Sequence, residues 1–251
     1  METMQFGGIE AGEYSLEQAR IVVLPLCYEH RVSYGKGTWQ GPRHILDASV
    51  QLEMLDDETF MDWSRLGIHT LPLLTPSDDP ETAVCQMKTA AKSVLDQGKF
   101  LLSLGGDHAI SIGPIMAAAE RFANLGVLQI DAHLDLRNEW NGSRYNHACV
   151  MRRVMDDIGC SAVQVGIRSV SPEEYAYVKQ NRLEPLYART ISGDDSGWMD
   201  AAIDRLPSHV YVTIDLDGLD PAVIPGVGTP EPGGLMYRPL IDLIRKLGER
   251  K

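Results

Sequence analysis

The residues most able to do chemistry lie in a short stretch near the middle of the chain. Asp131, His133 and Asp135 are each separated by one residue, and they follow the apolar run 125–130. Side chains alternate between the faces of a strand, so we expect these three to project to one side. Carboxylate oxygens and imidazole nitrogens are ligands for divalent metal ions. The stretch therefore predicts part of a metal site.

Two further stretches repeat this arrangement. Asp107 and His108 follow an apolar run that ends in two glycines. Asp215 and Asp217 follow another apolar run. In each case the ionisable residues come at the carboxyl end of an expected strand, which is where open α/β sheets bind their ligands.

Taken together, the first and third stretches bring four carboxylates into one small region, namely Asp131, Asp135, Asp215 and Asp217. Like charges a few ångströms apart disfavour ionisation, and burial adds to the cost. Divalent cations would offset it. The oxygen-rich, sulfur-free set favours Mn²⁺, with Zn²⁺ and Co²⁺ as alternatives. Two such ions, about 3.5–4 Å apart, would share bridging carboxylates.

Each stretch taken singly also has a structural interpretation. A lone histidine such as His108 after a glycine turn is more often a hydrogen-bonded loop residue than a ligand. Asp107 is a suitable cap for the helix that follows. The aspartates of the third stretch are common turn formers ahead of a proline. The metal hypothesis depends on the combination.

The elements that must position these residues alternate between strand and helix, which predicts βαβ units and a parallel sheet. Clear strands are expected at 21–26, 100–104, 125–131, 162–167 and 209–216, and weaker ones at 67–74 and 184–188. Helices are expected at 43–51, 81–97, 111–123, 151–158, 172–180, 197–206 and 239–247, with a short capped start at 15–18. The glycine-rich segment 33–42 is a loop, either a connector or a wall of the site.

Composition restricts the class of protein. The 251 residues are 44% hydrophobic, which suits one large domain over residues 1–251. The net charge is −12, without a basic run, so we expect no nucleic-acid partner and consider a cationic small molecule compatible. The four cysteines form no CxxC pair, which is typical of a reducing compartment. With neither a signal-like N-terminus nor a membrane-spanning run, we expect a cytoplasmic protein without a membrane partner.

The three stretches resemble, in order and spacing, the signature motifs of the ureohydrolases, the arginase and agmatinase family. The likeness runs from the loop 34–37 to the segment 228–235 and so covers most of the chain. It is closer to bacterial and archaeal agmatinases, because 131–137 continues into 143–149 without the polar residues that hold the α-amino and α-carboxylate groups in arginases.

This resemblance implies a three-layer α/β sandwich around a mostly parallel sheet, the arginase-like fold. It implies hydrolysis of agmatine to putrescine and urea with two Mn²⁺ per subunit, in a homotrimer or homohexamer that serves polyamine biosynthesis. Guanidinobutyrate or arginine is an alternative substrate. Such a substrate would need a cation for its carboxylate, for which Arg137, Arg144 and Lys36 are candidates.

The resemblance also implies roles for individual residues. One Mn²⁺ would be bound by His108, Asp131, Asp135 and Asp215, and the other by Asp131, His133, Asp215 and Asp217. Asp135 and His147 would be the catalytic residues that transfer protons.

The family pattern continues beyond the helix at 239–247 with a further strand inside the sheet, which carries a glutamate for the substrate's guanidinium. The chain ends at Lys251, so we expect this last strand to be missing and the domain to be short at its C-terminus. Glu231 is not assigned the missing role. An inactive relative that acts as a binding protein is therefore a further alternative, and reduced activity is expected.

Overall fold

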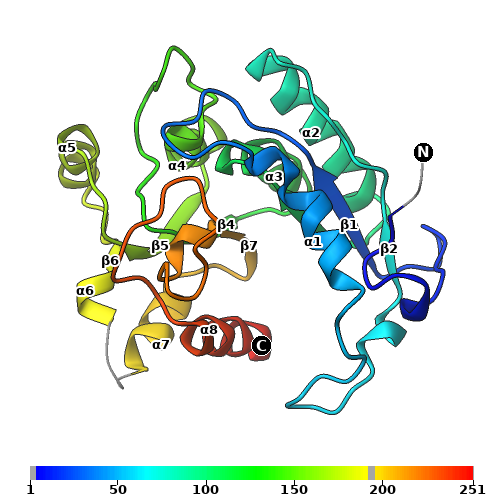
Figure 1. Cartoon of the computed structure of the whole chain (residues 1–251). Helices are drawn as coiled ribbons and strands as arrows, with labels where there is room; N and C mark the ends of the chain where they lie inside the picture. The colour runs from blue at the N-terminus through cyan, green and yellow to red at the C-terminus, as the bar shows by residue number, and fades with distance from the viewer. Residues whose placement is uncertain (1–3, 192–195, 251) are drawn as a thin grey trace. The chain divides into compact units, whose positions relative to one another are not determined.

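The computed structural model describes residues 4–191 and 196–250, so the first three residues of the N-terminal segment lie outside it. The chain divides into two compact units. Unit 1 comprises Met1–His30 and Lys36–Arg121, and unit 2 comprises Arg31–Gly35 and Phe122–Lys251. Each unit contains one parallel sheet and is described by itself (Figure 1). A single domain over the whole chain stays a prediction.

The sheet of unit 1 has the order β2-β1-β3, with all strands parallel. Its strands are β1 (Ile21–Leu26), β2 (Ile68–Thr70) and β3 (Phe100–Gly105). The central strand β1 is almost entirely buried, as expected for a strand with neighbours on both edges. The strands predicted at 21–26 and 100–104 are confirmed. The weaker strand predicted at 67–74 is shorter than expected. It ends at Thr70, ahead of Pro72, which has no N–H for the ladder.

The helices of unit 1 are α1 (Gly41–Ser49), α2 (Pro80–Leu95) and α3 (Ile112–Arg121). Short 3-10 turns cover Ile9–Ala11, Thr38–Gln40, Trp63–Leu66 and His108–Ser111. Helix α2 begins where Asp79 accepts a hydrogen bond from the Thr82 N–H at 2.9 Å. The helix start expected at 15–18 was wrong. Ser15 and Gln18 do bond reciprocally there, at 3.1 and 3.4 Å, but they close only a single turn before β1 begins.

The sheet of unit 2 has the order β6-β5-β4-β7 and is also parallel throughout. Its strands are β4 (Leu125–Ile130), β5 (Ser161–Ile167), β6 (Leu186–Tyr187) and β7 (His209–Ile214). Every residue of β4 is buried, including the polar Gln129, as expected for a strand with neighbours on both edges. The strand predicted at 209–216 ends two residues earlier, because Asp215 caps the 3-10 turn Leu216–Gly218.

The helices of unit 2 are α4 (Val150–Arg152), α5 (Pro172–Asn181), α6 (Ala188–Ile191), α7 (Gly197–Asp204) and α8 (Tyr237–Glu249). Helix α4 continues as a π-helix over Arg153–Ile158, and a 3-10 turn covers His147–Cys149. The capping box of Ser171 and Glu174 fixes the start of α5. Helix α6 was not predicted from the sequence.

Apolar side chains from the sheet and from α7 and α8 form the core of unit 2. Leu128 of β4 and Val165 of β5 belong to the same buried cluster as Ala202 of α7 and Leu243 of α8. In Figure 1, α7 and α8 lie next to each other below this sheet. Burying their apolar faces is the main force that attaches both helices to the strands.

Strands β3 and β7 are edge strands. Within the described residues, β3 pairs only with β1, and β7 only with β4. Apolar side chains are exposed on both, with Phe100 67%, Leu102 41% and Ile214 37% accessible. The described ranges contain no helix long and apolar enough to span a bilayer. The parallel α/β architecture predicted from the sequence is confirmed in both sheets.

Candidate metal centre

Three predicted ligands meet in unit 2, at the carboxyl end of its sheet. Ligand atoms of Asp131, His133 and Asp217 all lie within 4.8 Å of one another. The His133 Nδ1 atom is 3.5 Å from Asp131 Oδ1 and 3.2 Å from Asp217 Oδ2. Both carboxylates are almost fully buried, whereas the imidazole is partly exposed. The three side chains form a group that could hold a cation.

The end of β4 positions the first of these carboxylates. The backbone N–H of Asp131 donates to the Val165 carbonyl at 3.0 Å, which continues the pairing with β5 by one residue. Its Oδ1 atom accepts the His133 N–H at 2.6 Å, and its Oδ2 atom accepts the Gln129 amide at 2.8 Å. Because both oxygens are oriented by hydrogen bonds, the carboxylate is held ready for a ligand.

The turn after β7 positions Asp217. Its Oδ1 atom accepts the Ala132 N–H at 3.2 Å, and its Oδ2 atom accepts the Thr229 hydroxyl at 2.9 Å. A Cβ atom on Gly218 would lie 2.8 Å from the Asp131 nitrogen. Only glycine therefore lets this turn come so close to the end of β4.

The electrostatics of the group suit a cation. Burial opposes charge on His133, but hydrogen bonds and proximity to Asp131 and Asp217 prevail and raise its pKa to about 11. In the absence of metal, the imidazole thus retains a proton between the two carboxylates. Oxygen and imidazole donors in this arrangement fit Mn²⁺ or a similar divalent ion, which would replace that proton.

Asp135 follows His133 by two residues, and Asp215 precedes Asp217 by two residues. Asp215 donates its N–H to the Ile130 carbonyl at 2.9 Å and accepts the Asp217 N–H at 3.2 Å. Asp135 is buried and has a left-handed backbone with a φ of 52°. Strand β4 ends at Ile130, so Asp131, His133 and Asp135 all follow the strand and the alternation that predicted one common face does not apply to them. The metal and catalytic roles of Asp135 stay predictions.

His147 lies in a hydrogen-bonded chain of side chains. Its Nε2 atom is 2.9 Å from the Ser33 hydroxyl, which accepts the Trp140 indole N–H at 3.0 Å. The Arg137 guanidinium lies over the Trp140 ring at 4.1 Å. Sequence reasoning identified His147 but missed Ser33 and Trp140. The glycine-rich loop at 33–42, considered as a wall of the site, was the available signal for Ser33.

The stretch in unit 1 uses its carboxylate structurally. Asp107 accepts the Ala109 N–H at 2.9 Å and the His30 N–H at 2.7 Å, and burial raises its pKa to about 7. The capping interpretation of Asp107 is therefore confirmed. A Cβ atom on Gly106 would lie 1.9 Å from the Tyr28 carbonyl oxygen. His108 begins the 3-10 turn that follows and is buried, and its role as a ligand stays a prediction.

Beside the metal group lie Arg168, which sequence reasoning missed, and Glu231, to which it assigned no role. Arg168 donates to six backbone carbonyls, those of Gly166, Asp217, Gly218, Leu219, Glu231 and Pro232. The Glu231 Oε1 atom lies 4.0 Å from His133 Nε2. No spacing rule points to either residue, because their partners are distant in sequence.

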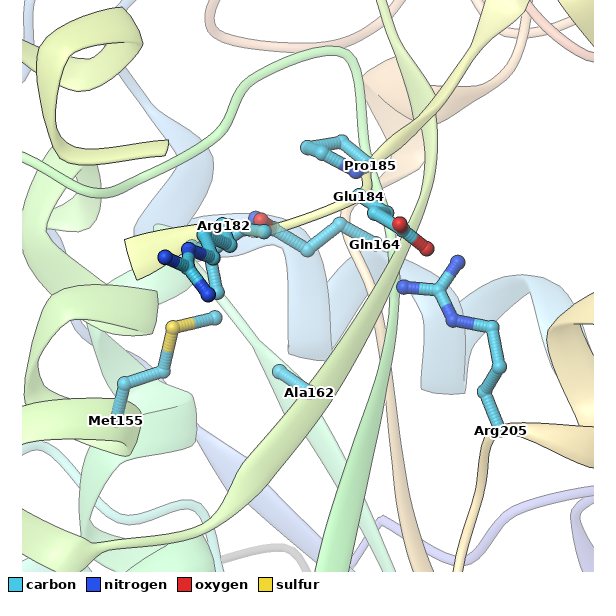
Figure 2. A pocket seen from close by; sticks show the side chains of 8 residues that line it. Met155, Ala162, Gln164, Arg182, Glu184, Pro185 and Arg205 are labelled. Carbon is cyan, nitrogen blue, oxygen red and sulfur yellow. The ribbon is translucent and has the colours of Figure 1, made fainter. Parts of the chain in front are cut away.

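A separate hollow of about 140 Å³ lies elsewhere in unit 2 (Figure 2). It is lined by Met155, Ala162, Gln164, Arg182, Leu183, Glu184, Pro185 and Arg205. Ala162 belongs to the amino-terminal part of β5, whereas parallel sheets bind ligands at their carboxyl ends. The metal group is therefore the better candidate for the functional site.

A parallel α/β fold with carboxylates and an imidazole at the carboxyl ends of its strands is typical of metal-dependent enzymes. The model of the arginase family matches residues 19–251, and the chain belongs to this family. The resemblance stated from the motifs is thus confirmed.

Relatives and solved structures agree with this assignment. The N(1)-aminopropylagmatine ureohydrolase of Synechocystis is 38% identical over 248 residues, which cover 94% of this chain and 79% of the relative. The agmatinase of Bacillus anthracis is 32% identical and is matched over 92% of this chain and 79% of its own length. The agmatine ureohydrolase of Thermoplasma volcanium superposes with a TM-score of 0.89 at 30% identity, covering 98% of this chain and 83% of that structure.

The fold comparison extends to the arginases. The arginase of Bacillus subtilis superposes with a TM-score of 0.77 at 25% identity, over 90% of this chain and 84% of that structure. The predicted arginase-like α/β fold is confirmed. The prediction of an agmatinase-like ureohydrolase is confirmed at the level of the enzyme family.

Proposed function

We propose that this protein hydrolyses the guanidinium group of a linear cationic guanidine, with agmatine giving putrescine and urea. The observation that carries the proposal is the convergence of Asp131, His133 and Asp217 within 4.8 Å, on positions of the family motifs. The net charge of −12 is compatible with a cationic substrate.

We further propose that the metal is Mn²⁺ and that two ions bind per chain. Asp131, His133 and Asp217 would be ligands, as their mutual distances support. His108, Asp215 and Asp135 are assigned from their motifs. When bound, the metal would lower the pKa of water towards about 7, which supplies a nucleophile at neutral pH.

His147 would move the protons that the reaction requires. Ser33 Oγ accepts the Trp140 indole N–H, so its own hydrogen is available to the His147 Nε2 atom 2.9 Å away. This contact orients the imidazole and gives Nε2 a partner for proton exchange. A neutral leaving amine would receive its proton from His147, with Asp135 as the second proton carrier.

The charges beside the site favour a substrate without a carboxylate. Arg137 lies 3.8 Å from Glu173, and Arg144 forms two hydrogen bonds with Asp157 at 3.0 and 3.1 Å. Each of these cations already has an acidic partner. At these two of the three candidate cations, recognition of the carboxylate of arginine or guanidinobutyrate would require an existing ion pair to break, which supports agmatine as the substrate.

N(1)-aminopropylagmatine is the second candidate substrate. It differs from agmatine by a longer arm with one more amine, and the relative from Synechocystis at 38% identity is named for it. The same hydrolysis would release urea and the aminopropylated diamine. Either reaction would place the protein in polyamine biosynthesis.

Urea release from a panel of guanidines tests the proposal. We expect kcat/KM for agmatine or its aminopropyl derivative to exceed that for arginine and guanidinobutyrate by at least about 100-fold, since an unmatched buried charge costs several kcal/mol. A preference for arginine would contradict the substrate assignment. Two Mn²⁺ per chain by elemental analysis would support the enzyme over a polyamine-binding relative, whereas no bound metal would favour the latter.

We also propose a cytoplasmic homo-oligomer, a trimer or hexamer, with no nucleic-acid or membrane partner. The absence of a basic run in the sequence and the family resemblance support this proposal. Light scattering on the purified chain would measure the mass directly, and a monomer at all concentrations would contradict it.

A further inference from the structure

The carboxylate of Glu231 lies on the outer side of His133 in unit 2. Its Oε1 atom is 4.0 Å from His133 Nε2, whereas His133 Nδ1 faces Asp131 and Asp217 at 3.5 and 3.2 Å. The two ring nitrogens therefore face different acidic groups. Nδ1 faces predicted metal ligands, and Nε2 faces a residue to which no motif gives a role.

The tautomer of His133 decides whether Nδ1 can bind a metal. A neutral imidazole carries one hydrogen, so a lone pair on Nδ1 requires the hydrogen to be on Nε2. Metal-binding histidines commonly donate this second N–H to a carboxylate, which fixes the orientation of the ring and makes it a better ligand. Glu231 is a carboxylate on the correct side of His133.

The backbone at Glu231 is fixed to the turn that carries Asp217. The Arg168 Nη2 atom donates at 2.6 Å to the Glu231 carbonyl and at 2.6 Å to the Asp217 carbonyl. A little further along the same loop, the N–H groups of Gly233 and Gly234 donate to Asp220 at 2.8 and 3.1 Å. Because the backbone is already fixed, a contact between Glu231 and His133 costs only the conformational entropy of the Glu231 side chain.

The present separation allows a hydrogen bond after a small movement. A distance of 4.0 Å is an ion-pair distance, about 1 Å longer than a hydrogen bond. The Glu231 side chain is 39% exposed, so it has room to rotate towards Nε2 or to contact it through one water molecule. Either movement would occur when a metal fixes the opposite nitrogen.

We propose that Glu231 is a positioning residue that accepts the Nε2 hydrogen of His133 and thereby holds the Nδ1 lone pair towards Asp131 and Asp217. This inference rests on the metal site of the proposed function. It assigns Glu231 to metal affinity and not to direct recognition of the substrate.

Titration calorimetry of the metal-free full chain with Mn²⁺ tests the inference. We expect Glu231→Ala to weaken the binding of one of the two ions by about 10–100-fold, the usual effect of removing such a partner. Glu231→Gln should lose less, because its amide oxygen still accepts a hydrogen bond. Glu184→Ala is the matched control. Glu184 is an exposed glutamate of the same unit that lines the separate hollow in Figure 2, so its removal should leave Mn²⁺ affinity unchanged.

Steady-state kinetics distinguish the two roles open to Glu231. Wild-type Mn²⁺ affinity in Glu231→Ala, with only the KM for agmatine raised, would mean that Glu231 contacts the substrate, and the inference would be wrong. Wild-type affinity with unchanged kinetics would also overturn it. Thermal unfolding of the metal-free variants controls for folding. If the wild-type chain bound no Mn²⁺, the proposed function itself would fail, and the control variant would behave in the same way.

Discussion

The turn after β3 in unit 1 and the turn after β7 in unit 2 look alike in sequence but use their carboxylates differently. Both turns follow a parallel strand, contain a glycine in close contact with backbone, and continue into a 3-10 turn. In unit 1, both oxygens of Asp107 accept backbone N–H groups. In unit 2, Asp217 also faces the His133 ring, at 3.2 Å. An aspartate after a strand is therefore a ligand candidate only when another donor side chain meets it.

The largest expected effect separates these two aspartates. Asp217→Asn removes a charge from the metal group, so we expect loss of at least one Mn²⁺ and a fall in kcat/KM of about 10³-fold or more, since metal catalysis contributes several kcal/mol. Asp107→Asn should also lower kcat/KM, but its loss should be at least tenfold smaller than that of Asp217→Asn. Metal analysis and urea release on both variants measure this, and equal losses would break the comparison.

The next effect concerns how unit 2 holds its site. Arg168→Ala leaves several carbonyl oxygens without their donor, and we expect it to lower the free energy of unfolding by about 2–3 kcal/mol. Arg144→Ala is the control, because the pair that Arg144 forms with Asp157 is exposed and worth about 0–1 kcal/mol. Urea denaturation of the metal-free proteins gives both values. Similar losses of unfolding free energy in the two variants would mean that Arg168 does not hold the turn at Asp217 to the loop at Glu231.

The pH dependence of stability should reveal the buried carboxyl of unit 1. Burial raises the pKa of Asp107 from 3.8 to about 7, so between these values the folded state binds more protons than the unfolded state. The contribution of Asp107 to stability therefore falls as pH rises from about 4 to 7, by about 1.4 kcal/mol per unit of pKa difference. Metal-free wild type should lose stability relative to Asp107→Asn across this range. A constant difference would argue against the raised pKa.

The smallest expected effect is the pH dependence of stability from Asp220 in unit 2, whose pKa is lowered where that of Asp107 is raised. Hydrogen bonds from the backbone N–H groups of Ala222, Gly233 and Gly234 lower the pKa of Asp220. The stabilisation is thus fully present above about pH 4 and is lost as pH falls through the lowered pKa. Asp220→Asn should be less stable than wild type at pH 6, and the two should converge in strong acid. Guanidinium unfolding at several pH values would detect this, and a gap that persists at pH 2 would exclude ionisation as its cause.

Much of the fold was predictable because it depends on local patterns. Apolar runs identified all the longer strands, and the strand at 21–26 matches at both ends. The predicted ends of strands were wrong where a side chain caps the backbone or where a proline interrupts the pairing. Asp215 ends β7 in this way, and a proline ends β2. The helix α6 carries no periodic signal over its four residues, so nothing in the sequence announced it.

The sequence by itself determined the class of the protein, since the order and spacing of its acidic and histidine motifs identify the arginase family. Only the tertiary structure decided which carboxylate caps a turn and which side chains support the ligands. Ser33 meets His147 across 114 residues of chain, and Arg168 meets Glu231 across 63. Such contacts depend on how strands and loops pack, and no local pattern encodes them, because hydrogen bonds between distant residues are specified only by the fold.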